Sequence, residues 1–326
     1  MLPVAVDAMG GDHAPDTIVA AARAAAATGT PVALVGPEDL GDRLDLGGLP
    51  LIPASEVIEM HDDPAQGVRR KKDSTLVRAA EAVRDGKASA MISAGTTGAT
   101  MAAALLRMGR IKGVSRPAIA TPIPVPGSRP TVLLDAGANA EVQADWLVQF
   151  AQMGAVFARH RFDVAEPRVG LLSIGEEPGK GDTLRKEAYE LLVSAPGIKF
   201  IGNVEGRDVM TDAVDVVVTD GFTGNVVLKT LEGGMRTVVR ALLAAFASEE
   251  RYKPHAEALL PALLPLYETL DPETYGGAIL LGVDGVCIIA HGSSSERAIV
   301  NGIQLAREMV EAGIVDEIHA AVAAGS

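Results

Sequence analysis

The chain has 326 residues, of which 48% are hydrophobic and 3% aromatic, and its formal net charge is −13. This length suits one large α/β domain or two smaller lobes, and the negative charge argues against nucleic-acid binding, which needs a basic surface. The single cysteine, Cys287, excludes an internal disulfide, and no stretch approaches the roughly 20 apolar residues that cross a bilayer. No secretory leader is recognisable, so we expect a cytoplasmic protein.

Short aliphatic or β-branched stretches alternate with Ala- and Leu-rich stretches over the first two thirds of the chain. Strands are predicted at 3–7, 31–36, 89–95, 131–137, 168–175, 198–204 and 214–221. Helices are predicted near 14–28, 74–85, 97–109, 141–160 and 182–194. This alternation predicts right-handed crossovers and a mostly parallel sheet covered on both faces, which is a three-layer α/β/α fold.

The character of the sequence changes after residue 222. Residues 224–250 are predicted as one long helix of roughly seven turns, interrupted by Gly233 and Gly234. A Pro-punctuated apolar segment follows at 255–270, then two further strands within 278–292 and a last helix that begins within 293–302. We expect a single catalytic domain over 1–326, with two lobes as an open alternative, and a helical extension at about 226–272.

Five predicted strands end in turns of small residues: DAMGGD (7–12), SAGTTGA (93–99), DAGAN (135–139), SIGEEPGKG (173–181) and TDGFTGN (219–225). Ligands of parallel sheets gather at the carboxyl ends of the strands, so these turns are expected to line one crevice. Glycines allow close approach of backbone, and helix starts offer free amides to an anion. The predicted substrate-binding residues are Asp7, Gly10, Gly11, Asp12, His13, Ser93, Gly95, Thr96, Thr97, Gly98, Asp220, Gly221, Thr223, Gly292 and Ser293.

Each of these turns also has a purely structural interpretation. The hydroxyls of SAGTTGA could cradle phosphate or simply cap a helix, and Asp7 and Asp12 are expected to brace their turn. Thr223 or Asn225 could cap the long helix, but an amide at 225 could equally donate to a carbonyl oxygen that gains charge. His291 suits anion or carbonyl binding, or a capping or core role.

The stretch SIGEEPGKG is not a P-loop. Gly175 to Gly179 is one residue short of the pattern, and Gly181 stands where the metal-binding Ser or Thr belongs, so nucleotide hydrolysis is excluded. Lys180 could still neutralise charge on a reacting oxygen or sulfur, or remain a solvated loop lysine. HExxH and CxxC are absent, and no metal or cofactor is expected.

Two surface stretches are open to more than one interpretation. The basic run Arg69, Arg70, Lys71 and Lys72 could be a solvated face or a docking site for an acidic protein. LLPALLPL (259–266) could be a core or dimer-interface segment, or a hydrophobic tip at a membrane surface.

Nine stretches occur in the order found in one protein family. They are VDAMGGDHAP (6–15), VRRKKDST (68–75), ISAGTTGA (92–99), GRIKGVSRPA (109–118), LLDAGAN (133–139), GNVEGRD (202–208), DVVVTDGFTGNVVLKTLEG (215–233), YGGAILLG (275–282) and AHGSSS (290–295). In them the chain resembles the bacterial phosphate acyltransferases, the PlsX family. Thr96 stands where that family usually has Asn, and residues 248–270 depart from its pattern.

The resemblance implies transfer of a fatty acyl group from acyl-[acyl-carrier-protein] to orthophosphate, giving acyl phosphate and free carrier. It further implies a homodimer, a fold like the isocitrate and isopropylmalate dehydrogenases, and peripheral attachment to the inner face of the membrane, where a glycerol-3-phosphate acyltransferase takes the product. Under this hypothesis the loops at 9–13 and 93–98 hold phosphate, and Lys180, Asn225 and His291 are the catalytic residues. Residues 69–72 would dock the acidic carrier.

Three rival functions remain open at this point. The first is a phosphate acyltransferase that uses a coenzyme A thioester. The second is a metal-dependent decarboxylating dehydrogenase, for which no convincing set of aspartates and arginines is present. The third is a non-enzymatic membrane scaffold of lipid synthesis.

Overall fold

A computed structural model describes residues 1–325, which form one sheet of eleven strands. In spatial order the sheet runs β3-β2-β1-β4-β11-β10-β5-β6-β9-β7-β8. The strands are β1 (Val4–Asp7), β2 (Val32–Gly36), β3 (Leu51–Pro53), β4 (Ala90–Ser93), β5 (Ala118–Ile123), β6 (Thr131–Leu134), β7 (Arg168–Leu172), β8 (Lys199–Val204), β9 (Val216–Val218), β10 (Ala278–Leu281) and β11 (Val286–Ile289).

The sheet consists of two parallel blocks joined by antiparallel strands. Strands β3, β2, β1, β4 and β11 are parallel to one another, and so are β6, β9, β7 and β8. The junction consists of β10 and β5, since β11–β10, β10–β5 and β5–β6 are all antiparallel pairs. The prediction of a mostly parallel sheet is therefore confirmed. The antiparallel strands in its middle, which reverse the strand direction, were not predicted from the sequence.

Helices pack on both faces of the sheet because successive strand side chains point to opposite sides. Val4 and Val6 of β1 belong to one hydrophobic core and Ala5 to the other. The first core is covered by α1 (Asp16–Ala27), α6 (Ala144–Phe162), α7 (Thr183–Val193), α10 (Glu296–Glu311) and α11 (Ile314–Ala323). The second is covered by α4 (Thr75–Arg84), α5 (Thr97–Ala103) and the π-helical turn η1 (Ala104–Met108).

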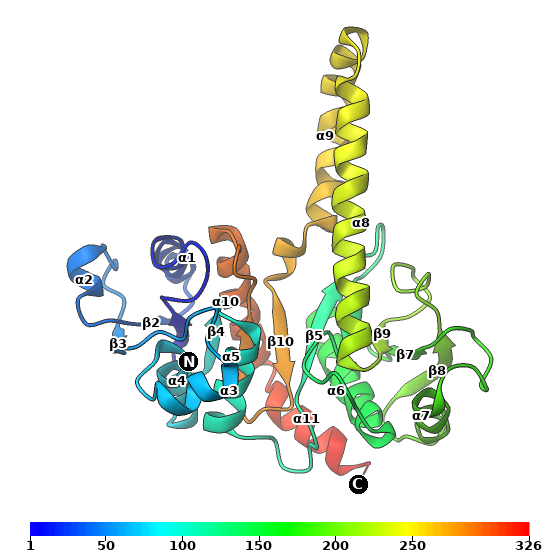
Figure 1. Cartoon of the computed structure of the whole chain (residues 1–326), viewed down its shortest axis with the longest axis horizontal. Coiled ribbons are helices and arrows are strands. Elements are labelled where there is room, and N and C mark those ends of the chain that lie inside the picture. Colours follow the sequence, from blue (N-terminus) through cyan, green and yellow to red (C-terminus); the bar gives the residue numbers. More distant parts are fainter. Residues whose placement is uncertain (326) are drawn as a thin grey trace.

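A long helical hairpin projects from the body of the molecule (Figure 1). It consists of α8 (Gly221–Ala247), the short turn η2 (Glu250–Tyr252) and α9 (Lys253–Leu270). Helix α8 passes through Gly233 and Gly234 without a break, so the predicted interruption there is wrong. Within residues 1–325, no helix is both long and apolar enough to span a membrane.

Most of the hairpin makes no contact that buries its side chains. In α8 only Gly221 and Gly224 are buried, and α9 has no buried residue. Apolar side chains are nevertheless exposed along both helices: Val238, Leu242, Leu243, Leu259, Leu260, Leu264 and Leu266. The hairpin thus presents an apolar surface that the rest of the described chain leaves uncovered.

Several short elements were not predicted from the sequence. They are β3, β5, α2 (Leu40–Arg43), α3 (Pro64–Arg70), the turn η3 (Pro272–Tyr275) and α11, which follows the helix predicted as the last one. Strand β5 contains Pro122, and proline normally argues against a strand that is paired on both sides. The structure nevertheless pairs β5 with β10 and with β6, where Pro122 lies opposite Val132.

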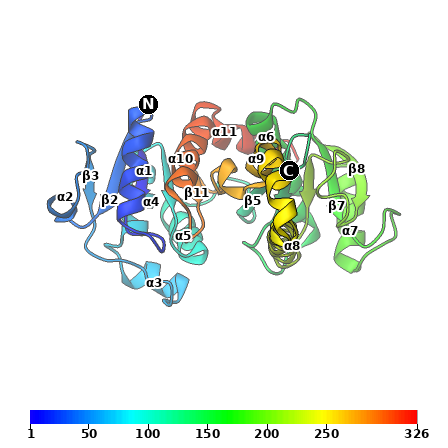
Figure 2. The ribbon, with the colours of Figure 1, turned by 90° about the horizontal axis from the view of Figure 1, so that it is seen from above.

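The carboxyl ends of the two parallel blocks come to the same side of the molecule. Six neighbouring pairs separate β1 from β9. Neighbouring strands in a twisted sheet are rotated by about 20–25° relative to each other, so the strand direction turns by roughly 130° between β1 and β9. This rotation largely offsets the opposite direction of the two blocks that the antiparallel strands β10 and β5 introduce. Figure 2 accordingly shows α3, α5 and α8, which lie at these ends, along one long side.

Candidate functional site

At the first block, the turn after β1 is tied to the turn after β4. The Ser93 hydroxyl donates to Asp7 Oδ2 at 2.7 Å, and the Gly95 amide donates to Ser93 Oγ at 2.9 Å. A Cβ on Gly10 would lie 2.7 Å from Asp7 Oδ2 and 2.8 Å from the Gly95 nitrogen, so only glycine fits there. Burial raises the pKa of Asp7, although hydrogen bonds from Ser93 and Met9 oppose it. Asp7 and Ser93 therefore brace this loop pair.

The SAGTTGA turn leads directly into α5. Thr96 caps that helix, since its hydroxyl accepts from the Ala99 amide at 3.1 Å. Thr97 follows it with an exposed side chain, which remains available to a ligand. A Cβ on Gly98 would lie 2.8 Å from Pro64 Cγ, so this glycine lets α3 pack closely against α5.

The turn after β11 (291–293) contacts the turn after β1 (7–13), which also contacts the turn after β4 (93–98), and these three turns are called the first loop group below. The Asp12 amide donates to the Gly292 carbonyl at 2.8 Å, and Gly11 has a positive φ of +107° beside that same carbonyl. His291 Nδ1 accepts from the Ser293 amide at 3.2 Å and lies 2.8 Å from Ser293 Oγ. Because Nδ1 accepts this hydrogen bond, the proton of the neutral imidazole lies on Nε2, and Nε2 can donate it to a ligand. Both His291 and His13 are exposed.

At the second block, Asp220 begins α8. Its Oδ1 accepts from the Thr223 amide at 2.8 Å, so Asp220 is the cap of this helix rather than Thr223 or Asn225. Oδ2 accepts from the Thr223 hydroxyl at 2.8 Å and forms an ion pair with Arg185 of α7. Burial raises the pKa of Asp220, but the Thr223 hydrogen bonds and the Arg185 charge outweigh it and hold the pKa below its usual value.

The charge of Asp220 is expected to stabilise the fold in a pH-dependent manner. Asp220→Asn keeps a good capping residue but removes the charge beside Arg185, and should lower the free energy of unfolding by about 2 kcal/mol at pH 7. Because the folded-state pKa lies below the unfolded value of 3.8, the wild-type advantage is present above pH 3.8 and disappears as pH falls through the folded pKa. Urea unfolding at several pH values measures this difference, and equal stabilities at pH 7 would contradict it.

The DAGAN turn after β6 lies beneath the start of α8. Buried Asp135 accepts five hydrogen bonds, from the amides of Ile119, Gly137, Ala138 and Asn139 and from the Asn139 side chain. Burial raises the pKa of Asp135 and these donors oppose that shift. The Gly221 amide donates to the Asn139 carbonyl at 2.7 Å, so the turn and the helix form one rigid unit.

Two of the predicted catalytic side chains remain free to meet a ligand here. Asn225 is exposed on the first turn of α8, where its side chain lies against Gly137, and it makes no side-chain hydrogen bond within residues 1–325. Lys180 is exposed in the loop before α7, and its Nζ lies 3.9 Å from Glu177 Oε1, also exposed. Such a surface pair holds a lysine only weakly.

Hydrogen bonds and close contacts join the predicted turns into two groups. The first unites 7–13, 93–98 and 291–293, and the second unites 135–139, 219–225 and, through Arg185, 173–183. Within residues 1–325, no hydrogen bond or ion pair joins the groups. Sequence reasoning had not singled out Arg185 or the capping role of Asp220, because the two residues are 35 positions apart.

The basic run ends α3, beside the first loop group. Arg69, Arg70 and Lys72 are exposed and have no carboxylate partner in the described chain. Lys71 differs, since its Nζ is held by Asp62 at 2.6 Å and by the Val57 carbonyl at 2.7 Å. Three of the four predicted docking residues are therefore open to solvent and the fourth is engaged within the chain.

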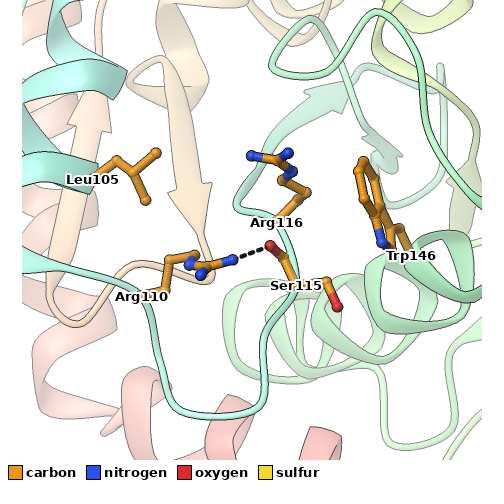
Figure 3. Close-up of a pocket in the computed structure, with 5 residues that line it drawn as sticks. All are labelled: Leu105, Arg110, Ser115, Arg116 and Trp146. Carbon is orange, nitrogen blue, oxygen red and sulfur yellow. Dashed lines mark hydrogen bonds between the residues drawn. The ribbon is translucent and has the colours of Figure 1, made fainter.

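A hollow of about 540 Å³ opens between the two parallel blocks (Figure 3). Leu105 of η1 and Arg110 lie on one side of it. Arg116, from the loop before β5, and Trp146, from α6, lie on the other side, and Ser115 lies between the two sides. The guanidinium carbon of Arg116 lies 5.0 Å from the centre of the Trp146 ring. No carboxylate pairs with either arginine within residues 1–325. None of these residues was predicted as a site residue, although both arginines lie in GRIKGVSRPA.

Comparison with known proteins bears on what this arrangement does. Residues 2–317 match the family model described as "Fatty acid synthesis protein". A phosphate acyltransferase from Desulfitobacterium hafniense is 48% identical over 98% of this chain and 96% of its own length. One from Elusimicrobium minutum is also 48% identical, over the same shares of the two chains.

Solved structures of other proteins share the fold. The EutD phosphotransacetylase from Staphylococcus aureus has a TM-score of 0.61 at 16% identity, covering 95% of this chain and 94% of that one. The 4-hydroxythreonine-4-phosphate dehydrogenase from Klebsiella pneumoniae has a TM-score of 0.56 at 13% identity, covering 95% and 100%. Given the full-length sequence matches, the chain belongs to the phosphate acyltransferase family and is a transferase of the fatty acid and phospholipid synthesis group.

Proposed function

We propose that this enzyme transfers a fatty acyl group from acyl-[acyl-carrier-protein] to orthophosphate, giving acyl phosphate and free carrier protein. A phosphate oxygen attacks the thioester carbonyl carbon, the C–O bond forms, the C–S bond breaks, and the departing thiolate takes up a proton. Phosphate is already a nucleophile near neutral pH, so the protein need only position the reactants and stabilise the tetrahedral oxyanion.

The observation that carries the proposal is the set of unengaged donors at the carboxyl ends of the strands. Asn225 has a free amide on a rigid helix start, Lys180 is exposed in the same loop group, and His291 is exposed in the first loop group. In this mechanism Asn225 donates to the thioester oxygen, Lys180 offsets charge on phosphate or thiolate, and His291 orients phosphate. The backbone amides at 9–13 and the start of α5 hold the phosphate itself.

The larger organisation is part of the same proposal. We take residues 1–326 as one catalytic domain of the isocitrate dehydrogenase-like type with a helical extension, because one sheet takes strands from both ends of the chain. The uncovered apolar side chains of α8 and α9 support a homodimer through the hairpin, with its tip on the inner face of the cell membrane. There the product would pass to a membrane glycerol-3-phosphate acyltransferase.

The proposed reaction has a direct test. Purified protein is incubated with orthophosphate and either an acyl carrier protein thioester or an acyl coenzyme A, and acyl phosphate is trapped with hydroxylamine. We expect hydroxamate to form faster with the carrier thioester. Product from coenzyme A alone would assign the rival donor, and no hydroxamate from either would refute the transfer.

The same assay tests carrier docking on α3. Arg69→Glu/Arg70→Glu should raise the KM for the acidic carrier thioester by about tenfold, because reversed charges repel it, and leave the KM for acyl coenzyme A unchanged. Arg43→Glu/Lys87→Glu makes the same change in net charge away from α3 and serves as the control. Equal KM values for the two double variants would place docking elsewhere.

A further inference from the structure

We propose that the hollow between the blocks binds the phosphate group on the 4′ end of the donor's pantetheine arm. The inference rests on the proposed function, since carrier protein and coenzyme A thioesters share this arm. The side chains that line the hollow include two cations, Arg110 and Arg116, and two apolar groups, Leu105 and Trp146. That combination fits an organic phosphate better than a bare ion.

The two arginines are free to bind an anion. The chain carries a net charge of −13, yet neither Arg110 nor Arg116 pairs with a carboxylate within residues 1–325. The Arg116 guanidinium makes a cation–π contact with Trp146, and this contact uses none of its N–H donors, which stay available to a phosphate oxygen. Arg110 donates one N–H to the Ser115 carbonyl and retains its other donors.

The loop that carries both arginines is held rigidly. Gln149 of α6 accepts from the Ser115 amide at 2.8 Å and donates to the Gly113 carbonyl at 3.0 Å. At the end of the loop, the Asn139 side chain donates to the Pro117 carbonyl at 2.8 Å. A ligand binding here therefore meets a preformed site, with little ordering cost.

The dimensions and position of the hollow favour an arm rather than orthophosphate. A volume of about 540 Å³ is within the ~300–1,000 Å³ typical of small-molecule sites and far exceeds a single orthophosphate ion. Trp146 lies in the first turn of α6, which follows the DAGAN turn of the second loop group. Asn139 contacts both this loop and the start of α8, so an arm anchored here lies beside the proposed reaction centre.

Binding can be measured without catalysis because Trp146 is the only tryptophan of the chain. Titration of the full-length protein with pantetheine 4′-phosphate should give a saturable change in tryptophan fluorescence. Arg116→Gln should raise the Kd about ten- to hundredfold, as expected when a hydrogen bond to a charged group is lost. Arg43→Gln, an exposed arginine on α2, should leave the Kd unchanged.

Two further titrations identify the source of the phosphate group. Pantetheine without its phosphate should bind much more weakly than the phosphorylated form. Orthophosphate that saturates the signal at lower concentration than pantetheine 4′-phosphate would make the hollow an acceptor site and overturn the proposal. The absence of any saturable change with pantetheine 4′-phosphate would overturn it as well.

Kinetics separate this inference from the proposed function. Arg116→Gln should lower kcat/KM with acyl coenzyme A by about tenfold or more, but leave kcat/KM unchanged with an acyl-pantetheine thioester, which keeps the arm but lacks its phosphate. Equal losses with both donors would refute the assignment of the hollow. A wild-type protein that forms no acyl phosphate would refute the proposed function, while the fluorescence titration would still decide the binding site.

Discussion

Lys180→Ala is expected to lower kcat for acyl phosphate formation by about 100-fold or more, with the free energy of unfolding unchanged. The lysine is exposed, and its one carboxylate partner, Glu177, is a weak surface contact at 3.9 Å. Its removal therefore costs the fold little, whereas a cation beside the developing charge stabilises the transition state. Initial rates at saturating donor and phosphate measure the effect.

The control for this variant lies on the next helix. Lys186→Ala removes the same charge from an exposed position on α7, six residues further along, and should retain a wild-type rate. A near-normal kcat in Lys180→Ala would remove this residue from the mechanism. Equal losses in both variants would indicate a general effect of charge on the rate and would refute a specific role for Lys180.

Gly224→Ala is expected to destabilise the protein by about 3 kcal/mol or more, because overpacking against backbone has no cheap relief. A Cβ at this position would overlap the carbonyl oxygen of Asp135, in the turn that supports the start of α8. Neither the turn nor the helix can shift easily, since the Gly221 amide already binds the Asn139 carbonyl. Urea unfolding should show a lower midpoint, and activity should fall with it because Asn225 is the next residue.

A second glycine of the same helix supplies the matched control. Gly233 has no neighbouring atom within 4 Å of an added Cβ. Gly233→Ala should stabilise the protein by about 0.5–1 kcal/mol, since alanine is the better helix former. If both variants had the same stability, the close approach of α8 to the DAGAN turn would be refuted.

Local patterns in the sequence predicted most of the sheet. Continuous apolar runs located the strands around Val4, Ile92 and Val217, and glycine-rich turns followed at their carboxyl ends. Strand β5 was missed because Pro122 opposes strand formation, and only pairing with β10 and β6 overrides that preference. Tertiary pairing of this kind cannot be seen in a local pattern.

The site was less predictable than the sheet. Glycine-rich turns could be named, but their division into two groups depends on the antiparallel junction at β10 and β5, which joins distant segments. Asp220 acts as a cap because its carboxylate reaches Thr223 and Arg185, and the arginine comes from another helix. The hollow gathers Leu105, Arg116 and Trp146 from three separate elements. No spacing rule predicts such a convergence.

The position of β10 and β11 affects how this protein can be made. These strands lie between β4 and β5 in the middle of the sheet, yet residues 278–289 are synthesised long after residues 90–123. Until they are synthesised, β4 and β5 are unpaired edges, and exposed edges are templates for aggregation. Folding must then close contacts over about 200 residues, a separation that slows folding. The nascent chain therefore depends on residues 278–289 to unite two otherwise separate half-sheets.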